Sequence, residues 1–151
     1  MNRLFMALAL AVLAAKPAIA SDRTDVLAHV RHFVDSFNKG DTKAAAAACA
    51  DEATILDEFP PYGWHGMGAC ARWMDDYDAD ARKNAITDGA VTLSNPRHVD
   101  ITADRAYVVV PASYTYKKKG RLVKETGSMF TLVLQRSKEG WHVTGWAWAK
   151  N

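Results

Sequence analysis

The sequence holds few of the patterns that identify a chemistry on their own. Its 151 residues contain no cofactor-binding fingerprint and no visible pairing of a nucleophile with a general base. Apart from His65, the sequence contains four histidines, namely His29, His32, His98 and His142. These four show no spacing typical of metal ligands. We therefore predict no metal and no cofactor, and the sequence argues against covalent and redox catalysis.

Long hydrophobic runs are also scarce, and the one at the start of the chain is short. Residues 4–15 are apolar, follow a basic start at Arg3, and precede a small-x-small cleavage site at Ala18-Ile19-Ala20. A membrane anchor is the alternative, but such a span needs roughly 20 apolar residues, and Lys16-Pro17 interrupts this run. The pattern favours a secretory signal peptide over residues 1–20.

Cleavage after residue 20 leaves one domain of 131 residues with no excess of charge. Arg3 and Lys16 are removed and no acid is lost, so the 19 Lys and Arg fall to 17 and equal the 17 Asp and Glu. No stripe of basic residues is interleaved with aromatic ones, which argues against a nucleic-acid partner. We predict a single domain over residues 21–151, periplasmic or secreted, with no membrane association after cleavage.

Cysteine is rare, with only Cys49 and Cys70 present. In an oxidising compartment such a pair is more often a disulfide than a site. The alternative is two buried thiols that act as small apolar side chains. We favour the disulfide, and because both residues are expected on helices, it would join the second helix to the third.

The first third of the chain has the patterns of helices. Apolar residues recur at three- and four-residue spacing over Asp22–Asn38, and Gly40 is placed to end this helix. Asp41 can cap a second, alanine-rich helix that ends near Cys49-Ala50. Residues 53–57 read as a strand, and a third helix is expected over Met67–Ala81. Four of its residues are expected to face inward: Met67, Cys70, Ala71 and Met74.

From Ile86 onward the pattern changes to strands separated by turn signals. The expected strands are Ile86–Leu93, His98–Thr102, Arg105–Lys117, Leu122–Gln135 and Trp141–Ala149. The last three are long and closely spaced, which predicts an antiparallel meander. Pro111 within a long strand indicates an edge position or a bulge that would curve the sheet. The fold class is thus α+β, a cone-shaped roll of three helices packed on a strongly curved antiparallel sheet.

Four short motifs in this order resemble the nuclear transport factor 2-like superfamily, which includes ketosteroid isomerase and the SnoaL-like polyketide cyclases. The motifs are Phe37-Asn38-Lys39-Gly40-Asp41, residues 50–57, Trp64-His65-Gly66 and Gly140-Trp141-His142-Val143. The resemblance covers essentially the whole chain after the signal peptide and implies an internal apolar pocket. It implies no single activity, because this fold hosts enzymes and binding modules alike.

The resemblance places the proton-transferring aspartate of ketosteroid isomerase on Asp57, counted without gaps from Asn38. The two oxyanion donors of that enzyme fall on Phe33 and near Ser128-Met129, so only a hydroxyl remains at best. The candidate catalytic residues are therefore Asp57 and His65, where His65 could orient a ligand or pair with Asp57. For each a structural role is the alternative: Asp57 could bind loop N–H groups, and His65 could serve as a hydrogen bonder at a helix entry.

The ligand-binding candidates are the aromatic and small residues expected to face the pocket. They are Phe33, Phe37, Tyr62, Trp64, Met74, Ala112, Tyr114, Tyr116, Ser128 and Trp141. On the last strand, alternation with Trp141 and Val143 inward puts Trp146 and Trp148 on the outer face of the sheet. Exposed tryptophans on that face predict a homodimer through it. A slip of one residue would instead fill the pocket with indoles.

Two classes of function are compatible with these residues. The first is a cofactor-independent isomerase, cyclase or dehydratase that moves a proton on a small hydrophobic carbonyl compound. Asp57 would be its base, and Tyr62, His65, Tyr114 or Ser128 its donor. The second is a non-catalytic module that binds a small ligand or a protein partner as a dimer.

Overall fold

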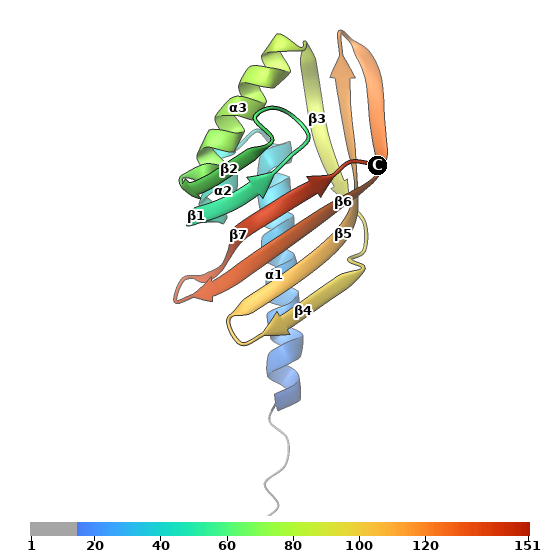
Figure 1. The fold of residues 1–151 in the computed structure, drawn as a ribbon. Coiled ribbons are helices and arrows are strands. Elements are labelled where there is room, and N and C mark those ends of the chain that lie inside the picture. The colour runs from blue at the N-terminus through green and yellow to red at the C-terminus, as the bar shows by residue number, and fades with distance from the viewer. Residues whose placement is uncertain (1–14) are drawn as a thin grey trace, which may run out of the picture.

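A computed structural model describes residues 15–151 and shows three helices packed against a curved, unclosed sheet of seven strands (Figure 1). The α+β class predicted from the sequence is confirmed, although one strand pair is parallel and the others are antiparallel. Residues 1–14 of the predicted signal peptide lie outside the described residues, and residues 15–20 form the start of the first helix.

The long first helix, α1 (Ala15–Asn38), crosses the concave side of the sheet. It ends at the predicted residue, where the Asn38 amide both donates to the Val91 carbonyl and accepts from the Val91 N–H, at 2.8 and 2.7 Å. The apolar stripe predicted for this helix is buried at Val26, Val30, Phe33 and Val34. These contacts hold the C-terminal half of α1 against the inner face of the sheet.

Helix α2 (Thr42–Ala47) is shorter than predicted. Asp41 caps it as expected, accepting from the Ala44 N–H at 2.9 Å. The chain leaves the helix early because Cys49 already belongs to strand β1 (Cys49–Leu56). A disulfide joins Cys49 to Cys70, and it links β1 to the third helix; the expectation that both cysteines lie on helices was wrong for Cys49.

The third helix, α3 (Ala69–Lys83), begins two residues later than predicted. The preceding residues form strand β2 (Gly63–Met67), which pairs antiparallel with β1 and places Trp64 opposite Ile55. Met67 therefore ends a strand with its side chain 62% exposed, and Ala71 is exposed as well. Both had been expected to face inward.

The remaining strands match the predicted ranges to within two residues at every end. They are β3 (Ile86–Leu93), β4 (His98–Thr102), β5 (Arg105–Lys118), β6 (Arg121–Ser137) and β7 (Gly140–Ala149). The sheet order is β2-β1-β7-β6-β5-β3, with β4 paired to the other end of β5. The predicted antiparallel meander of β5, β6 and β7 is confirmed.

A bulge in β6 curves the sheet near the position that Pro111 indicated. Ala112 pairs with Ser128 and Tyr114 with Glu125, so β6 contains one residue more than β5 between these pairs. Gly127 lies in this bulge with φ +80°, a conformation that L side chains rarely adopt. Side chains that face inward change here from even-numbered residues such as Ser128 to the odd-numbered Glu125.

A second bulge, in β7, overturns the prediction for the last strand. Val133 pairs with Gly145 and Leu134 with Val143, which leaves Thr144 as the extra residue. Trp141 and Val143 point inward as expected, but beyond the bulge Trp146 also points inward and is only 6% exposed. Trp146 and Trp148 therefore do not lie on the outer face, and they give no support to a dimer there.

The core lies between the inner face of the sheet and helices α1 and α3. Its fully buried members include Val26, Ile55, Val108, Leu132 and Val143, which come from five different elements. Among residues 15–151, every helix is too short or too polar to serve as a membrane span.

Candidate functional site

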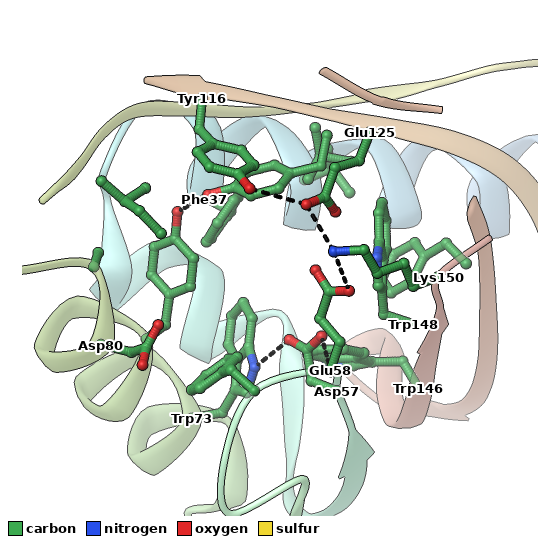
Figure 2. Close-up of a pocket in the computed structure, with 18 of the residues that line it drawn as sticks. Phe37, Asp57, Glu58, Trp73, Asp80, Tyr116, Glu125, Trp146, Trp148 and Lys150 are labelled. Carbon is green, nitrogen blue, oxygen red and sulfur yellow. Dashed lines mark hydrogen bonds and ion pairs between the residues drawn. The ribbon is translucent and has the colours of Figure 1, made fainter. Parts of the chain in front are cut away.

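A cavity of about 380 Å³ opens between the inner face of the sheet, α1, α3 and the loop after β1 (Figure 2). Ten aromatic side chains line it: Phe33, Phe37, Phe59, Trp73, Tyr77, Tyr114, Tyr116, Phe130, Trp146 and Trp148. Five charged residues complete the polar part of the wall: Asp57, Glu58, Asp80, Glu125 and Lys150. The size and the apolar walls are typical of a site for a small organic ligand.

Asp57 follows the last residue of β1 and is held by two hydrogen bonds. Trp73 Nε1 donates to its Oδ2 at 2.8 Å, and the backbone N–H of Glu58 donates to its Oδ1 at 2.7 Å. Burial raises the pKa of the Asp57 carboxyl above its ordinary value, and the charge of Glu125 adds to this, although the two hydrogen bonds oppose it. The environment thus moves this group toward the pKa range of a general base.

Two tyrosines from different elements meet in the cavity. Tyr77 on α3 and Tyr114 on β5 share a hydrogen bond of 2.5 Å between their hydroxyl oxygens, and Tyr116 stacks on Tyr114 with ring centroids 4.8 Å apart. Burial raises the pKa of both Tyr77 and Tyr114, so both remain protonated at neutral pH. A Cβ on Gly89 would lie 2.5 Å from Tyr77 Oη and 2.6 Å from Tyr114 Oη, so only glycine leaves room for this pair. One hydroxyl of the pair has its proton free to donate to a ligand.

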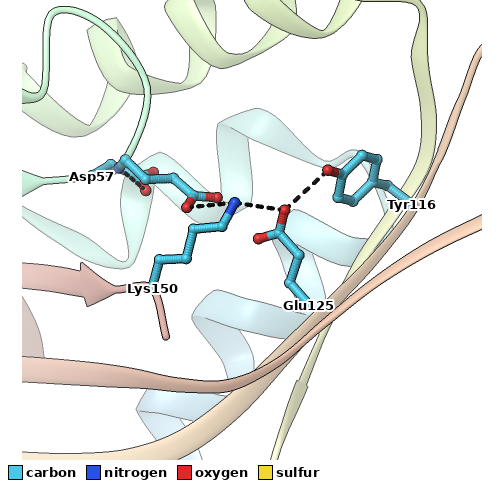
Figure 3. Close-up of polar contacts among 5 residues, drawn as sticks. Asp57, Tyr116, Glu125 and Lys150 are labelled. Atoms are coloured by element: carbon cyan, nitrogen blue, oxygen red, sulfur yellow. Dashed lines mark hydrogen bonds and ion pairs between the residues drawn. The ribbon is translucent and has the colours of Figure 1, made fainter.

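A second polar cluster joins the C-terminus to the loop after β1 (Figure 3). Lys150 Nζ lies 3.1 Å from Glu58 Oε2 and 2.8 Å from Glu125 Oε1, and Tyr116 Oη donates to the same Glu125 oxygen at 3.0 Å. Burial acts to raise the pKa of Glu125, but the hydrogen bonds from Lys150 and Tyr116 outweigh it and hold the pKa below its ordinary value. For Glu58 burial prevails and its pKa is raised. The hydrogen bond to Glu125 raises the pKa of Lys150.

Three buried polar atoms in the described part of the chain have no hydrogen-bond partner: Glu125 Oε2, Trp146 Nε1 and Ser128 Oγ. Two of them, on Glu125 and Trp146, belong to residues that line the cavity. Buried polar groups are nearly always paired in native proteins, so unpartnered ones beside a cavity indicate a ligand or solvent that completes them. The cavity thus has one acceptor and one donor without a partner.

The structure brings five of the predicted site residues together in the cavity wall: Phe33, Phe37, Asp57, Tyr114 and Tyr116. They come from α1, the end of β1 and the inward face of β5. Tyr114 and Tyr116 share the inward face of their strand because no bulge interrupts β5 itself.

The other predicted residues lie outside the cavity wall. His65 is exposed on β2, away from the cavity wall. Tyr62 is 59% exposed in the loop before β2. Trp64 is buried, but its Nε1 donates to Asp76 at 2.8 Å. Met74, Ala112 and Ser128 are core residues that do not reach the cavity, and Trp141 is buried with the Arg136 guanidinium 5.1 Å above its ring.

Several residues of the cavity wall were not predicted. Trp73, Tyr77, Asp80 and Ala81 lie on one face of α3, and their i, i+4, i+7 and i+8 spacing is a signal in the sequence that could have found them. Glu125, Trp146 and Trp148 face inward only because of the two bulges. The ion pair between Glu58 and Lys150 joins residues 92 positions apart, so no local sequence pattern predicts it.

No protein-family model matches the chain, and no curated protein matches it. Solved structures do match over most of its length. A nuclear transport factor 2-like protein with a cystatin-like fold from Novosphingobium aromaticivorans has a TM-score of 0.74 at 16% identity, covering 94% of this chain and 92% of that chain. A ketosteroid isomerase-like protein from Erwinia carotovora atroseptica has a TM-score of 0.66 at 19% identity, with 84% and 94% covered.

A third similar structure is described as a candidate dehydratase of the nuclear transport factor 2-like family, from Streptomyces avermitilis. Its TM-score is 0.72 at 18% identity, with 87% of this chain and 98% of that chain covered. The protein therefore has the nuclear transport factor 2-like fold, as its sequence motifs predicted. At these identities the likeness shows the fold alone, and the activity has to be argued from the site.

Proposed function

We propose that the cavity binds a small hydrophobic carbonyl compound and that Asp57 moves a proton on it, as a cofactor-independent isomerase, cyclase or dehydratase. The observation that carries this proposal is the placement of the Asp57 carboxylate, held by Trp73, in the wall of an aromatic cavity that also contains a hydrogen-bonded tyrosine pair. A base and a donor of this kind are the two groups that enolisation requires.

In the proposed reaction, the Asp57 carboxylate takes a proton from the carbon next to the carbonyl and becomes a carboxylic acid. The free hydroxyl proton of the Tyr77–Tyr114 pair stabilises the negative charge that develops on the carbonyl oxygen. Asp57 then returns its proton to another carbon, which isomerises the compound, or to a hydroxyl that leaves as water. Of the four donors predicted from the sequence, only Tyr114 lines the cavity, and Tyr77 joins it.

The test is proton–deuteron exchange in D₂O, followed by NMR on a panel of cyclic and aromatic ketones. Asp57→Asn should slow exchange by about 10²- to 10⁴-fold, the usual contribution of a general base. Tyr114→Phe should slow it by about 10²- to 10³-fold. Asp76→Asn is the matched control, since Asp76 also accepts from a tryptophan Nε1 but lies outside the cavity. Equal exchange by the wild type and Asp57→Asn would refute the proposal.

A non-catalytic ligand-binding module is the second candidate. The observation in its favour is that both oxygens of Asp57 already have a donor, Trp73 on one and the Glu58 N–H on the other. Under this alternative no ketone exchanges, the cavity still binds small apolar molecules, and Asp57→Asn changes only the melting temperature.

We also propose that the mature protein is exported and forms a homodimer through the outer face of the sheet. The signal-peptide pattern supports export, as does the disulfide, which persists in oxidising compartments. For the dimer, the support is apolar exposure on the outer face: Leu56 is 50%, Tyr107 43% and Val133 42% exposed. Light scattering at micromolar concentration should give twice the mass of residues 21–151, and Val133→Lys should halve it; a monomeric wild type would contradict the dimer.

A further inference from the structure

The charge in the cavity wall is unbalanced toward the negative. Of the described residues that line it, Asp57, Glu58, Asp80 and Glu125 carry carboxyl groups, and Lys150 alone carries a cation. Figure 2 shows Trp73 and Asp57 on one side of the cavity, with Tyr116 and Glu125 on the opposite side. A ligand that occupies the whole cavity therefore meets a carboxylate at both ends.

The contacts of Lys150 show that the end near Glu125 accommodates an ammonium group. Its Nζ lies 3.1 Å from Glu58 and 2.8 Å from Glu125 (Figure 3). Lys150 is the penultimate residue, follows the end of β7, and has a side chain that is 50% exposed. Such a partly exposed ion pair contributes little to stability, so the lysine can leave the two carboxylates when another cation takes its position.

The second oxygen of Glu125 points to the same kind of ligand. Its Oε2 is buried and has no partner, even though Lys150 and Tyr116 both contact Oε1. A carboxylate oxygen accepts hydrogen bonds only, so a ligand group that bonds this atom must carry N–H or O–H. An ammonium group supplies several donors and could bond both oxygens of Glu125.

Aromatic faces next to these carboxylates also favour a cation. Figure 2 shows Trp148 beside Lys150 and Tyr116 beside Glu125. Cations bind over the faces of Trp and Tyr, and the attraction is stronger where water is displaced. Carboxylates combined with aromatic faces discriminate against an anionic ligand.

We propose that the ligand of this cavity carries a protonated amine, which replaces the Lys150 ammonium between Glu58 and Glu125. The exchange of one ammonium for another never leaves the two carboxylates unpaired, so the ligand pays no penalty for uncovering a buried charge. This inference rests on the proposed function for the reacting end of the molecule. The substrate is then a hydrophobic carbonyl compound with an amine that lies between Glu58 and Glu125.

The test compares three probes of the same shape, 4-phenylbutylamine, 4-phenylbutan-1-ol and 4-phenylbutyrate, by calorimetry at neutral pH and low salt. The amine should bind the wild type at least about tenfold more tightly than the alcohol, as expected for a hydrogen bond to a charged group. Glu125→Gln should remove this preference, because it should weaken amine binding far more than alcohol binding. Glu52→Gln, an exposed glutamate on β1 outside the cavity, is the matched control and should change neither.

Lys150→Met provides an independent readout, because it removes the competing ammonium. It should tighten amine binding by about two- to fivefold, the range expected for a partly exposed ion pair, and leave the alcohol unchanged. Any one of four results would overturn the inference. They are equal binding of amine and alcohol, tighter binding of the butyrate, weaker amine binding to Lys150→Met, and no binding of any probe at millimolar concentration.

These outcomes are separate from those of the exchange assay, since none of the three probes is a ketone and none is a substrate for that exchange. Ketone exchange that depends on Asp57, together with no amine preference, would uphold the proposed function and refute the amine. An amine preference without any exchange would uphold the amine-binding site and assign it to a binding module.

Discussion

Trp73→Phe is the substitution that most directly tests how the cavity sets the protonation of Asp57. The indole Nε1 of Trp73 donates to Asp57 Oδ2 at 2.8 Å, and this bond opposes the effect of burial on the carboxyl. Phenylalanine keeps an aromatic ring in the wall and removes the donor. The charged form of Asp57 then loses one of its two hydrogen bonds.

The expected size of the effect follows from the energy of such a bond. A hydrogen bond to a charged group contributes roughly 1.5 to 3 kcal/mol, and 1.36 kcal/mol corresponds to a pKa change of one. Trp73→Phe should therefore raise the pKa of Asp57 by about 1 to 2 above its wild-type value. The backbone N–H of Glu58 remains as a donor and limits the rise.

The measurement is an NMR titration of the Asp57 side-chain carboxyl carbon in both proteins. Trp64→Phe is a matched control, because Trp64 Nε1 also donates to an aspartate at 2.8 Å, but that residue is Asp76 outside the cavity. The control should leave the titration of Asp57 in place. An unchanged or lower pKa in Trp73→Phe would refute the reasoning, since it would mean that water entering beside the smaller ring solvates the carboxylate as well as the indole does.

Three further predictions concern stability. Replacing Cys49 and Cys70 with alanine opens a loop of 21 residues and should lower the free energy of unfolding by about 3 kcal/mol in urea titrations; an unchanged midpoint would exclude a disulfide in the purified protein. Asp57→Asn should raise the free energy of unfolding by about 0.5 to 2 kcal/mol at pH 7, and the gain should fade in acid. The sign follows from the raised folded-state pKa of Asp57. Protonated Asp57 stabilises the fold at pH values below its unfolded-state pKa, and this stabilisation is lost as the pH rises through its folded-state pKa. The neutral asparagine is free of this loss at pH 7. Gly145→Ala should cost about 1 to 3 kcal/mol by thermal melting, because its Cβ would lie 2.9 Å from the Thr54 carbonyl oxygen; an unaltered melting temperature would show that β1 and β7 can separate there.

The elements and most of their boundaries were predictable from local patterns. Alternation and turn residues located all five C-terminal strands, and three- and four-residue spacing located α1, although this helix begins at Ala15 and not at the predicted Asp22. The position of Asp57 in the pocket was implied by the resemblance to ketosteroid isomerase, and Asp57 lies in the cavity wall. Local patterns failed at β2, where Trp64 and His65 lie on a short strand that exists only because β1 provides its partner.

The cavity wall was harder to predict because its composition depends on non-local pairing. Strict alternation along β7 places Trp146 on the outside, and the extra residue Thr144 reverses this. The bulge at Gly127 does the same for Glu125. A bulge appears in neither strand alone, since it is a mismatch in length between two paired strands. Asp57 could therefore be placed in the site, while its polar surroundings could not.

The bulge at Thr144 also has a consequence for how this fold can diversify. If β7 kept all its residues but paired with β6 without this bulge, strict alternation would turn Trp146, Trp148 and Lys150 out of the cavity together. The placement of three side chains of the wall thus depends on one bulged residue, without any difference in their identity. The ligand preference of such a domain can therefore change with the presence or absence of one bulge.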